Sequence, residues 1–264
     1  MITLLNAGEM LANLADWYRV DPVDEPNHPE LATSQPIVYQ SLCVTRPEGV
    51  LLIDAPVYDD NDPGATPLPN YTPPPPLEEQ LQAAGVAPEA VTHLVITHAH
   101  GDHFNGLTRE SGGVDRPIYP NALHYLGRGD WEMIQPQLAD PQSLQSRTLG
   151  AVARAGLLQL VDSEMEILPG IRILPAPGES PGHQIVRIET DGEILYHVGD
   201  LYHHEVEVVR PEWACHWAEA TAHNVSRAAF LSAAIPENAR VLASHIEGFG
   251  RIRAVGEGMV WEKA

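Results

Sequence analysis

Three histidines and an aspartate within six consecutive positions constrain this chain more than any other feature. The segment His98-Ala-His-Gly-Asp-His103 directly follows residues 91–97, which have the composition of a buried strand. If that strand ends where the segment begins, His98 and His100 are two positions apart in extended chain and face the same way. Gly101 permits a sharp turn, after which the aspartate and the last histidine begin a helix. Because imidazole and carboxylate groups suit Zn²⁺ and its neighbours, the pattern predicts a metal site at a strand end.

The other ligands of such a site are expected at further strand ends, since these converge on one edge of a sheet. His183, Asp200 and His245 each stand at one end of a segment rich in strand-forming residues. Each alone would be an ordinary loop residue. Together with the first cluster they complete the ligand set of a two-metal site: His98, His100, Asp102, His103, His183, Asp200 and His245.

Strand and helix patterns alternate along the chain without a recognisable linker or repeat, which predicts one α/β domain spanning residues 1–264. Strand formers at 37–44 and 50–54 flank the turn Arg46-Pro-Glu-Gly49 and predict a hairpin. Further strands are expected at 157–161, 165–168, 171–175, 184–189, 194–199 and 240–244.

Two segments have helical periodicity. Leu77, Leu81 and Ala84 share one face of residues 77–84, and Gly85 is expected to end that helix. A second helix is expected near 221–234, with an apolar face made by Val225, Ala228, Leu231 and Ala234 or Ile235.

Residues 59–76 form a proline-rich insertion that interrupts this pattern, with four consecutive prolines at positions 73–76. Proline lacks an N–H donor, so the segment forms neither a central strand nor a helix interior. Long loops inside compact domains are usually functional or disordered. Two interpretations are open: a lid over the site, with Tyr71 as a substrate contact, or a plain excursion of the chain.

The charge balance narrows the choice of partners. The chain has 36 Asp and Glu against 15 Lys and Arg, a formal net charge of -21 at pH 7. Such a field repels phosphate backbones and argues against a nucleic-acid partner. The sequence contains no run of about 18 apolar residues, so no membrane-spanning helix is expected. The first residues lack the pattern of a signal peptide, and these two features together predict a cytoplasmic protein. Cys43 and Cys215 are expected to be buried small hydrophobes.

Four motifs of the chain resemble, in order and spacing, those of the metallo-β-lactamase superfamily over about residues 36–250. They are Thr97-His-Ala-His-Gly-Asp-His103, Ser180-Pro-Gly-His183, Gly199-Asp200 and Ser244-His245. The resemblance implies a four-layer αββα sandwich with the site at the sheet edges. It implies one metal on His98, His100 and His183, a second on Asp102, His103 and His245, and Asp200 as the bridge. Asp54 matches an aspartate that supports the site without binding metal.

Within the superfamily the chain is most similar to the branch of N-acyl homoserine lactone lactonases and methyl-parathion-hydrolase-like enzymes. The segments Gly199-Asp-Leu-Tyr-His-His204 and His245-Ile-Glu-Gly-Phe-Gly-Arg251 carry this similarity. His100 stands where flavodiiron-type members have glutamate, which favours zinc, although the same ligands accept manganese, cobalt or iron. In one lactonase group a tyrosine three residues after the bridging aspartate assists the substrate carbonyl. This chain has His203 at that position and Tyr202 one position earlier.

These features predict a metal-dependent hydrolase that cleaves a lactone, ester or phosphotriester with a hydroxide shared by two divalent ions. Asp102 is expected to ligate one ion and to transfer a proton. Tyr202 or His203 is expected to donate a hydrogen bond to the developing oxyanion, and a merely neighbouring role explains both equally well. Trp213 and Phe249 are candidates for lining an apolar pocket around a small-molecule substrate, although core packing also explains each.

Three alternatives remain at the level of sequence. A thioester hydrolase of the glyoxalase II type shares all seven ligands, but its basic C-terminal region has no counterpart in this lysine-poor tail. A mononuclear iron sulfur dioxygenase shares the histidines. A metal-binding protein without turnover would retain the ligands. The resemblance also suggests a homodimer.

Overall fold

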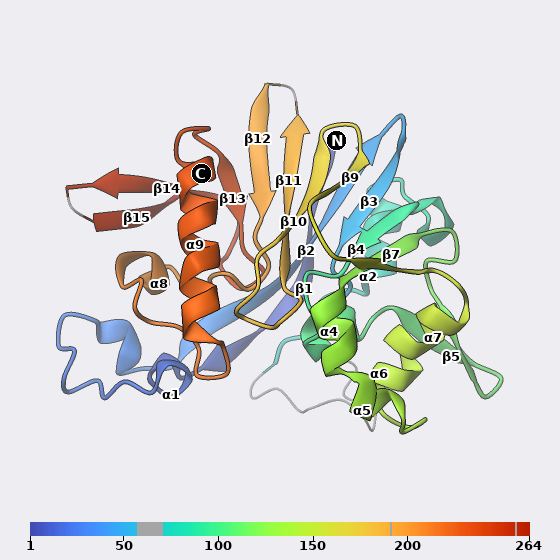
Figure 1. Ribbon diagram of the computed structural model, residues 1–264, viewed down its shortest axis with the longest axis horizontal. Helices are drawn as coiled ribbons and strands as arrows, with labels where there is room; N and C mark the ends of the chain where they lie inside the picture. Colours follow the sequence, from blue (N-terminus) through green and yellow to red (C-terminus); the bar gives the residue numbers. More distant parts are fainter. Residues whose placement is uncertain (57–70, 191, 257) are drawn as a thin grey trace.

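Two β-sheets lie face to face in the computed structural model, and helices cover the outer face of each (Figure 1). The structure describes residues 1–56, 71–190, 192–256 and 258–264. One cluster of buried side chains lies between the sheets, and one lies between each sheet and its helices. This is the four-layer αββα arrangement that the resemblance implies.

The first sheet has the strand order β1-β2-β3-β4-β7-β8. Strands β1 to β3 pair antiparallel, whereas β3, β4, β7 and β8 run parallel. The expected hairpin is β2–β3, and the expected strand at 91–97 is the shorter β4. The bounds are β1 (Ile2–Ala12), β2 (Gln35–Arg46), β3 (Gly49–Ile53), β4 (His93–Val95), β7 (Leu123–Gly127) and β8 (Leu158–Val161).

The second sheet has the order β15-β14-β13-β12-β11-β10-β9, with only the β12–β13 pair parallel. The strands expected from 165 to 244 are all present, whereas β14 and β15 were not predicted, and neither were β1 and β7 of the first sheet. The bounds are β9 (Met165–Leu168), β10 (Ile171–Pro175), β11 (Gln184–Thr190), β12 (Glu193–His197), β13 (Arg240–Leu242), β14 (Gly250–Val255) and β15 (Gly258–Lys263). A separate pair consists of β5 (Thr108–Ser111) and β6 (Val114–Pro117).

Side-chain alternation on β3 shows how the layers are divided. Leu51 and Ile53 pack against Val186 and Ile188 of β11 in the core between the sheets. Leu52 points to the opposite face and packs beneath the helices of the first sheet, because successive strand residues face opposite sides. Both faces of this strand are therefore buried, which explains its unbroken apolar sequence.

Short helices cover the outer face of the first sheet. Helix α2 (Leu77–Ala83) packs Leu77 and Leu81 into that face, and Gly85, with φ of 79°, ends it as expected. The others are α3 (Gly101–Phe104), α4 (Arg128–Met133), α5 (Gln135–Leu138), α6 (Leu144–Arg147) and α7 (Leu149–Arg154).

The proline-rich insertion falls only partly within the structure. Residues 59–70 lie outside the described residues, so the lid interpretation stays a prediction. The end of the segment runs beside β1, where Thr72 pairs with Glu9. The Tyr71 hydroxyl donates a hydrogen bond to the Ala7 carbonyl oxygen at 2.7 Å. Pro76 then precedes α2.

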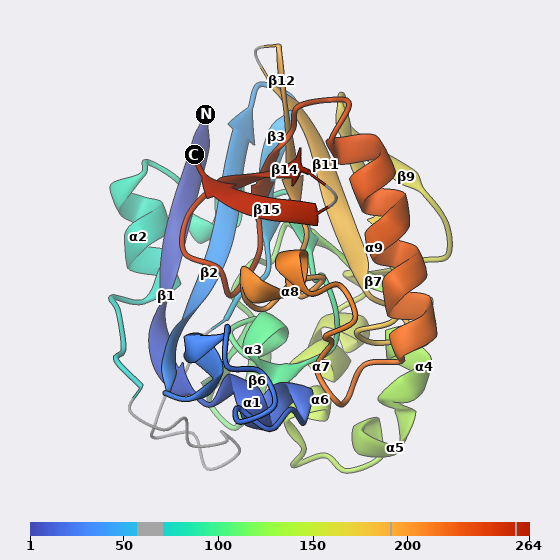
Figure 2. The same cartoon turned by 90° about the vertical axis from the view of Figure 1, so that its left-hand side faces the viewer.

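Helix α9 (Ala220–Ala234) covers the second sheet, as both views show (Figures 1 and 2). The helix was predicted, but its predicted apolar face is correct only in part: Ala234 is buried and Leu231 packs against the core, whereas Val225 is 66% exposed. The buried side also carries His223, Ser226, Arg227 and Phe230.

The reason for this rotation is a buried ion pair. Arg227 pairs with Glu207 of α8 (Val206–Val209) and donates to the carbonyl oxygens of Leu201 at 2.9 Å and Trp213 at 2.7 Å. These tertiary partners satisfy a charged side chain inside the protein. Hydrophobic periodicity cannot reveal them, because they lie on other segments.

Two smaller expectations concern membranes and cysteines. Within the described residues, no helix combines the length and the apolar character needed to cross a membrane. Cys43 and Cys215 are both buried and free, as predicted.

The orientation of α9 can be tested with two truncations on the same helix. Phe230 packs its ring against Tyr196 and Tyr202, with centroids 5.3 and 6.2 Å away. Phe230→Ala should therefore lower the free energy of unfolding by about 3–5 kcal/mol. Val225→Ala should change it by no more than about 0.5 kcal/mol. Urea unfolding with a chelator present measures both without a contribution from bound metal, and equal effects would contradict the orientation.

Candidate metal centre

The predicted ligand residues come together where four connecting segments meet at one edge of the two sheets. These segments follow β4, precede β11, follow β12 and follow β13. Their side chains form two clusters of ligand atoms that share Asp200. One cluster is His98, His100, Glu179 and Asp200, and the other is Asp102, His103, Asp200 and His245.

The second cluster has the spacing of ligands around one ion. The Nε2 atom of His103 lies 3.6 Å from Asp102 Oδ2 and 3.3 Å from Asp200 Oδ2. The Nε2 atom of His245 lies 3.4 and 3.2 Å from the same two oxygens. Atoms bound to one ion at about 2.0–2.2 Å lie roughly 3.0–3.6 Å from one another. The four side chains therefore surround a space suited to a small divalent cation.

The first cluster contains a residue that the sequence analysis did not name. His98 Nε2 lies 3.6 Å from Asp200 Oδ2 and 3.1 Å from Glu179 Oε2, and His100 Nδ1 lies 3.0 Å from Glu179 Oε1. No sequence signal distinguished this glutamate, because an acidic residue in a Pro-Gly-rich turn is usually solvated.

His183 lies beside the first cluster and is not a member of it. Its ring centroid is 5.2 Å from that of His98. Its Nε2 accepts a hydrogen bond from the Asp200 backbone N–H at 3.1 Å, and its Nδ1 lies 3.0 Å from the Ala176 carbonyl oxygen. The structure thus brings six of the seven predicted ligands into the clusters and places the seventh at their border.

Unsatisfied polar atoms provide a test of whether these residues fit metal ions. Four buried atoms of the clusters lack a hydrogen-bond partner among the described residues: His98 Nε2, His103 Nε2, Glu179 Oε2 and Asp200 Oδ1. Each such atom costs about 1–3 kcal/mol when nothing satisfies it. Divalent cations would satisfy all four at once, so the residues present fit a pair of ions.

The electrostatics of the clusters favour ionised carboxylates. Burial opposes the charge on Asp200, but His103, His245 and His203 outweigh it and hold its pKa well below the usual value. Burial likewise opposes ionisation of Asp102, and His103 and His245 lower its pKa to about 2. Both aspartates are therefore anionic acceptors for a cation at neutral pH.

Asp54 orients His103, one of the candidate ligands, from outside the cluster. Its carboxylate accepts hydrogen bonds from the Thr97 backbone N–H at 2.7 Å and hydroxyl at 2.8 Å. The same carboxylate lies 2.8 Å from His103 Nδ1, which leaves Nε2 facing the cluster. Carboxylates in this position fix the orientation of a metal-binding imidazole. This is the supporting position that the resemblance implies.

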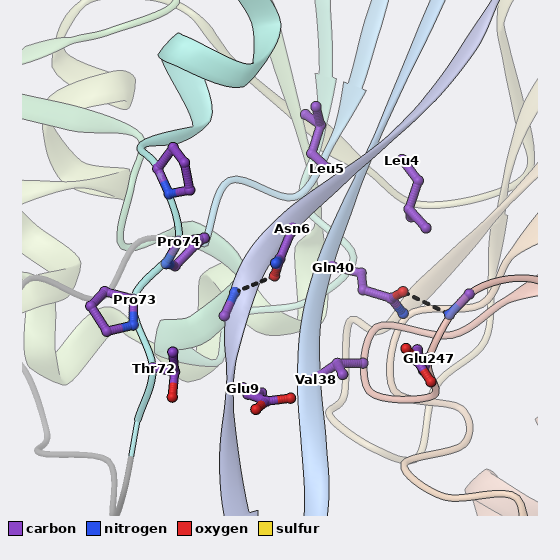
Figure 3. A pocket seen from close by; sticks show the side chains of 13 residues that line it. Leu4, Leu5, Asn6, Glu9, Val38, Gln40, Thr72, Pro73, Pro74 and Glu247 are labelled. Atoms are coloured by element: carbon purple, nitrogen blue, oxygen red, sulfur yellow. Dashed lines mark hydrogen bonds between the residues drawn. The ribbon is translucent and has the colours of Figure 1, made fainter.

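The loop that carries His245 is held by β2. His245 Nδ1 lies 2.9 Å from the Val38 carbonyl oxygen. The Gln40 amide donates to the carbonyl oxygens of Ala243 at 3.0 Å and Ile246 at 2.7 Å. Gln40 also lines a groove of about 630 Å³ between β1, residues 72–75 and the same loop (Figure 3). The described residues that line it include none of the two clusters, so this groove is distinct from the metal centre.

Comparison with known proteins identifies the family of this chain. Residues 41–245 match the family model of the Metallo-beta-lactamase superfamily. The chain belongs to this superfamily. The resemblance inferred from the sequence is thereby confirmed.

Relatives of the chain include N-acyl homoserine lactonases, in agreement with the predicted branch. One, from Bacillus thuringiensis, is 29% identical over 129 residues, which are 46% of this chain and 43% of the relative. The chain thus matches less than half the length of that protein. The dizinc quorum-quenching lactonase AidC superposes with a TM-score of 0.77 at 20% identity, covering 100% of this chain and 94% of AidC. The hydrolase AbOPH gives 0.79 at 18% identity, covering 100% and 94%. The two structural similarities show the shared fold.

His203 reaches the centre of this superfamily member, and Tyr202 does not. His203 Nε2 lies 3.3 Å from Asp200 Oδ2, and its Nδ1 lies 3.5 Å from Glu207 Oε1. Tyr202 is buried on the other side of the chain, with its ring against Phe230 and under the Arg227 guanidinium, 4.8 Å from the ring centroid. The two neighbouring side chains point to opposite sides of the chain, so His203 faces the clusters and Tyr202 does not.

The aromatic side chains predicted to contact substrate lie elsewhere. The Trp213 ring stacks on Tyr18 at 5.7 Å, within a hydrophobic cluster of the N-terminal segment. Phe249 packs against the core between the sheets and beneath Arg240. Both positions match the core-packing interpretation. Tyr71 packs between β1 and Tyr39, whose ring in turn lies 5.0 Å from that of His245.

Two tryptophans that the sequence analysis did not single out border the centre instead. Trp17 belongs to α1 (Leu14–Tyr18), and its ring lies 5.7 Å from that of Trp217. Both rings contact His203 edge-on, at 5.8 and 5.7 Å. They are 200 positions apart in the chain, so no local pattern links them. Together they form an apolar wall beside the two ligand-type clusters.

Asp130 joins two of the ligand-bearing segments. Its buried carboxylate accepts hydrogen bonds from the Ala99 N–H at 2.7 Å, the Ser180 hydroxyl at 2.9 Å and the Gly182 N–H at 2.6 Å. It thereby ties the segment of His98 to the turn that precedes His183. Burial raises its pKa, although the three donors oppose this shift.

Removing this carboxylate should loosen the metal centre. Asp130→Ala leaves three buried donors without an acceptor, so we expect a loss of about 2–4 kcal/mol in the free energy of unfolding and weaker metal binding. Chemical denaturation with and without metal measures both effects. Asp162→Ala is the matched control, because that aspartate pairs with Arg128 at the surface. Wild-type stability in Asp130→Ala would contradict its proposed role.

Proposed function

We propose that this superfamily member is a dinuclear metal-dependent hydrolase whose first substrate class is lactones and esters, with phosphotriesters second. The main support is the pair of ligand clusters that share Asp200, with ligand atoms 3.0–3.6 Å apart. The relatives named N-acyl homoserine lactonase support the preference for a lactone.

The proposed ligand assignment takes six residues from the clusters and His183 from the family resemblance. Asp102, His103 and His245 would hold one ion, His98, His100 and His183 the other, and Asp200 would contact both. Bound ions would supply Lewis acidity, which makes a water molecule nucleophilic near neutral pH and polarises the substrate oxygen. Zinc suits this donor set, and manganese, cobalt and iron share its ligand types.

Asp102 is the carboxylate best placed to take the proton of the attacking water. Its side chain is 19% exposed, against 3% for Asp200 and 0% for Glu179. Its Oδ2 contacts both His103 and His245, which keep the group ionised until a proton arrives. The same group can then pass the proton to the leaving alkoxide.

His203 is proposed to donate a hydrogen bond from Nε2 to the oxygen on which charge develops. The Glu207 carboxylate accepts a hydrogen bond from the His203 backbone N–H at 3.2 Å and lies 3.5 Å from the ring's Nδ1. Arg227 and the Tyr18 hydroxyl, at 2.7 Å, fix this carboxylate in turn. The imidazole is thus oriented before substrate arrives by the anchored backbone and by the edge-on contacts with Trp17 and Trp217. The Trp17 and Trp217 rings beside it would contact the apolar part of the substrate.

The two neighbouring candidates can be separated by substitution. His203→Asn should lower kcat by about 10²-fold through loss of the hydrogen bond to the oxyanion, with metal content unchanged. Tyr202→Phe should leave kcat close to wild type, because its ring faces α9. Steady-state kinetics with metal analysis measures both. The reverse order of effects would assign the role to Tyr202.

The reaction class is tested with one substrate panel and two metal states. A long-chain homoserine lactone, an aryl ester, a phosphotriester, a thioester and a β-lactam are offered to metal-loaded and chelator-stripped protein. We expect the highest rate on the lactone or ester, its loss on stripping and its return on adding metal. His98→Ala should lower that rate by about 10²-fold or more.

Other results of the panel would redirect the proposal. A dominant thioester rate would favour the glyoxalase II type of activity. No hydrolysis of any substrate, combined with bound iron and oxygen consumption with a persulfide, would replace hydrolysis with sulfur dioxygenation.

A further inference from the structure

We propose that Glu179 is an additional metal ligand in this chain. The ion beside His98 and His100 would then be held by this carboxylate as well as by imidazoles and Asp200. This inference rests on the proposed function, since both require ions at the same centre. It adds a negatively charged oxygen donor to the three histidines and bridging aspartate that the family resemblance implies.

The backbone directs Glu179 inward. The residue lies in the turn between β10 and β11, directly after Gly178, whose φ is 135°. A Cβ on Gly178 would come within 2.2 Å of the His223 backbone nitrogen at the start of α9, so this turn packs directly against the helix. The Glu219 N–H donates to the Gly178 carbonyl oxygen at 2.7 Å and holds it there. Little freedom remains for Glu179 to turn toward solvent.

The carboxylate of Glu179 is buried without a permanent cation. Its side chain is 0% exposed, and its ion-pair contacts among the described residues are with His98 and His100 only. Trp217 Nε1–H donates to Oε1 at 3.0 Å, whereas Oε2 has no hydrogen-bond partner within the described part of the chain. Burying a carboxylate is costly unless a cation or several donors compensate. A divalent ion between the carboxylate and the two imidazoles would provide that compensation.

The imidazole nitrogen that Glu179 contacts shows whether its carboxylate is placed as a metal ligand or as a group that orients a ligand. An orienting carboxylate contacts the imidazole nitrogen that points away from the metal, as Asp54 does at Nδ1 of His103. Glu179 instead contacts Nε2 of His98, the same atom that faces Asp200, while the Nδ1 of His98 faces the Thr97 hydroxyl. Glu179 therefore lies on the metal side of His98, where a ligand lies.

A third carboxylate changes which ions the centre prefers. With Asp102 and Asp200, Glu179 would give the pair of ions three anionic oxygen ligands. Carboxylate oxygens suit Mn²⁺ better than imidazole does, and one more ligand raises the coordination number above the four typical of zinc. We expect the wild-type protein to retain two Mn²⁺ ions per chain under conditions in which a centre without this carboxylate retains one.

The test compares Glu179→Gln with two other carboxylate variants. Glu179→Gln keeps an acceptor for Trp217 but removes the charge. Asp54→Asn removes the orienting carboxylate, and Glu189→Gln removes one that is 55% exposed and pairs with Arg187. Each protein is stripped, then titrated with Mn²⁺ and with Zn²⁺, and bound metal per chain is measured by elemental analysis. Co²⁺-loaded samples add an absorption spectrum that reports coordination number.

We expect Glu179→Gln to bind one of its two Mn²⁺ ions about 10²-fold more weakly than wild type, with a smaller loss for Zn²⁺ and a changed Co²⁺ spectrum. Asp54→Asn should weaken both metals equally, and Glu189→Gln should match wild type. If Glu179→Gln unfolds, Trp217→Phe serves as the second variant, because it releases the carboxylate without removing it and should weaken the same ion about 10-fold.

Two outcomes would overturn the inference, and they differ in what else they remove. If both Glu179→Gln and Trp217→Phe bind two ions with wild-type affinity and an unchanged Co²⁺ spectrum, Glu179 is not a ligand and the proposed hydrolase stands. If wild-type protein binds neither Mn²⁺, Zn²⁺ nor Co²⁺, the inference and the proposed function fail together.

Discussion

The buried carboxylate of Asp200 is the interaction on which the centre depends. Its Oδ2 lies 3.2–3.6 Å from the Nε2 atoms of four histidines that come from three separate segments: His98, His103, His203 and His245. A single anionic group can hold so many imidazoles only where the sheet edges bring the segments together. A carboxylate in this position is stable because the surrounding cationic or metal-bound groups compensate for lost water.

Polar side chains outside the clusters hold the irregular segments of the site in place. Asp54 fixes one histidine, Asp130 ties two ligand segments together, and Gln40 anchors the loop of His245. Each donor or acceptor in these contacts is buried, so losing one partner leaves another unsatisfied. Rigidity of the centre therefore comes from these hydrogen bonds in places where neither helix nor strand continues.

Local sequence patterns predicted much of the fold. The β2–β3 hairpin, the strands of the second sheet up to β13, α2 and the existence of α9 were all legible, because apolar periodicity and turn residues act over a few positions. The side of α9 that is buried was not legible, because the charge of Arg227 on that side is compensated by Glu207 from another segment. Strands β14 and β15 pair with each other as a local antiparallel hairpin, but most of their side chains are exposed or half-buried, so apolar periodicity does not mark them.

The sequence alone determined the chemistry of this protein: a tight run of imidazoles and carboxylate, and three further ligand types at strand ends. Those residue types favour metal-dependent chemistry, because imidazole and carboxylate groups are ligands that divalent ions such as zinc prefer. Tertiary structure decided which atoms meet. It turned His203 toward Asp200 and Tyr202 into the core, gathered Trp17 and Trp217 beside them, and buried Glu179 against His98. These outcomes depend on contacts between distant segments, which no local pattern encodes.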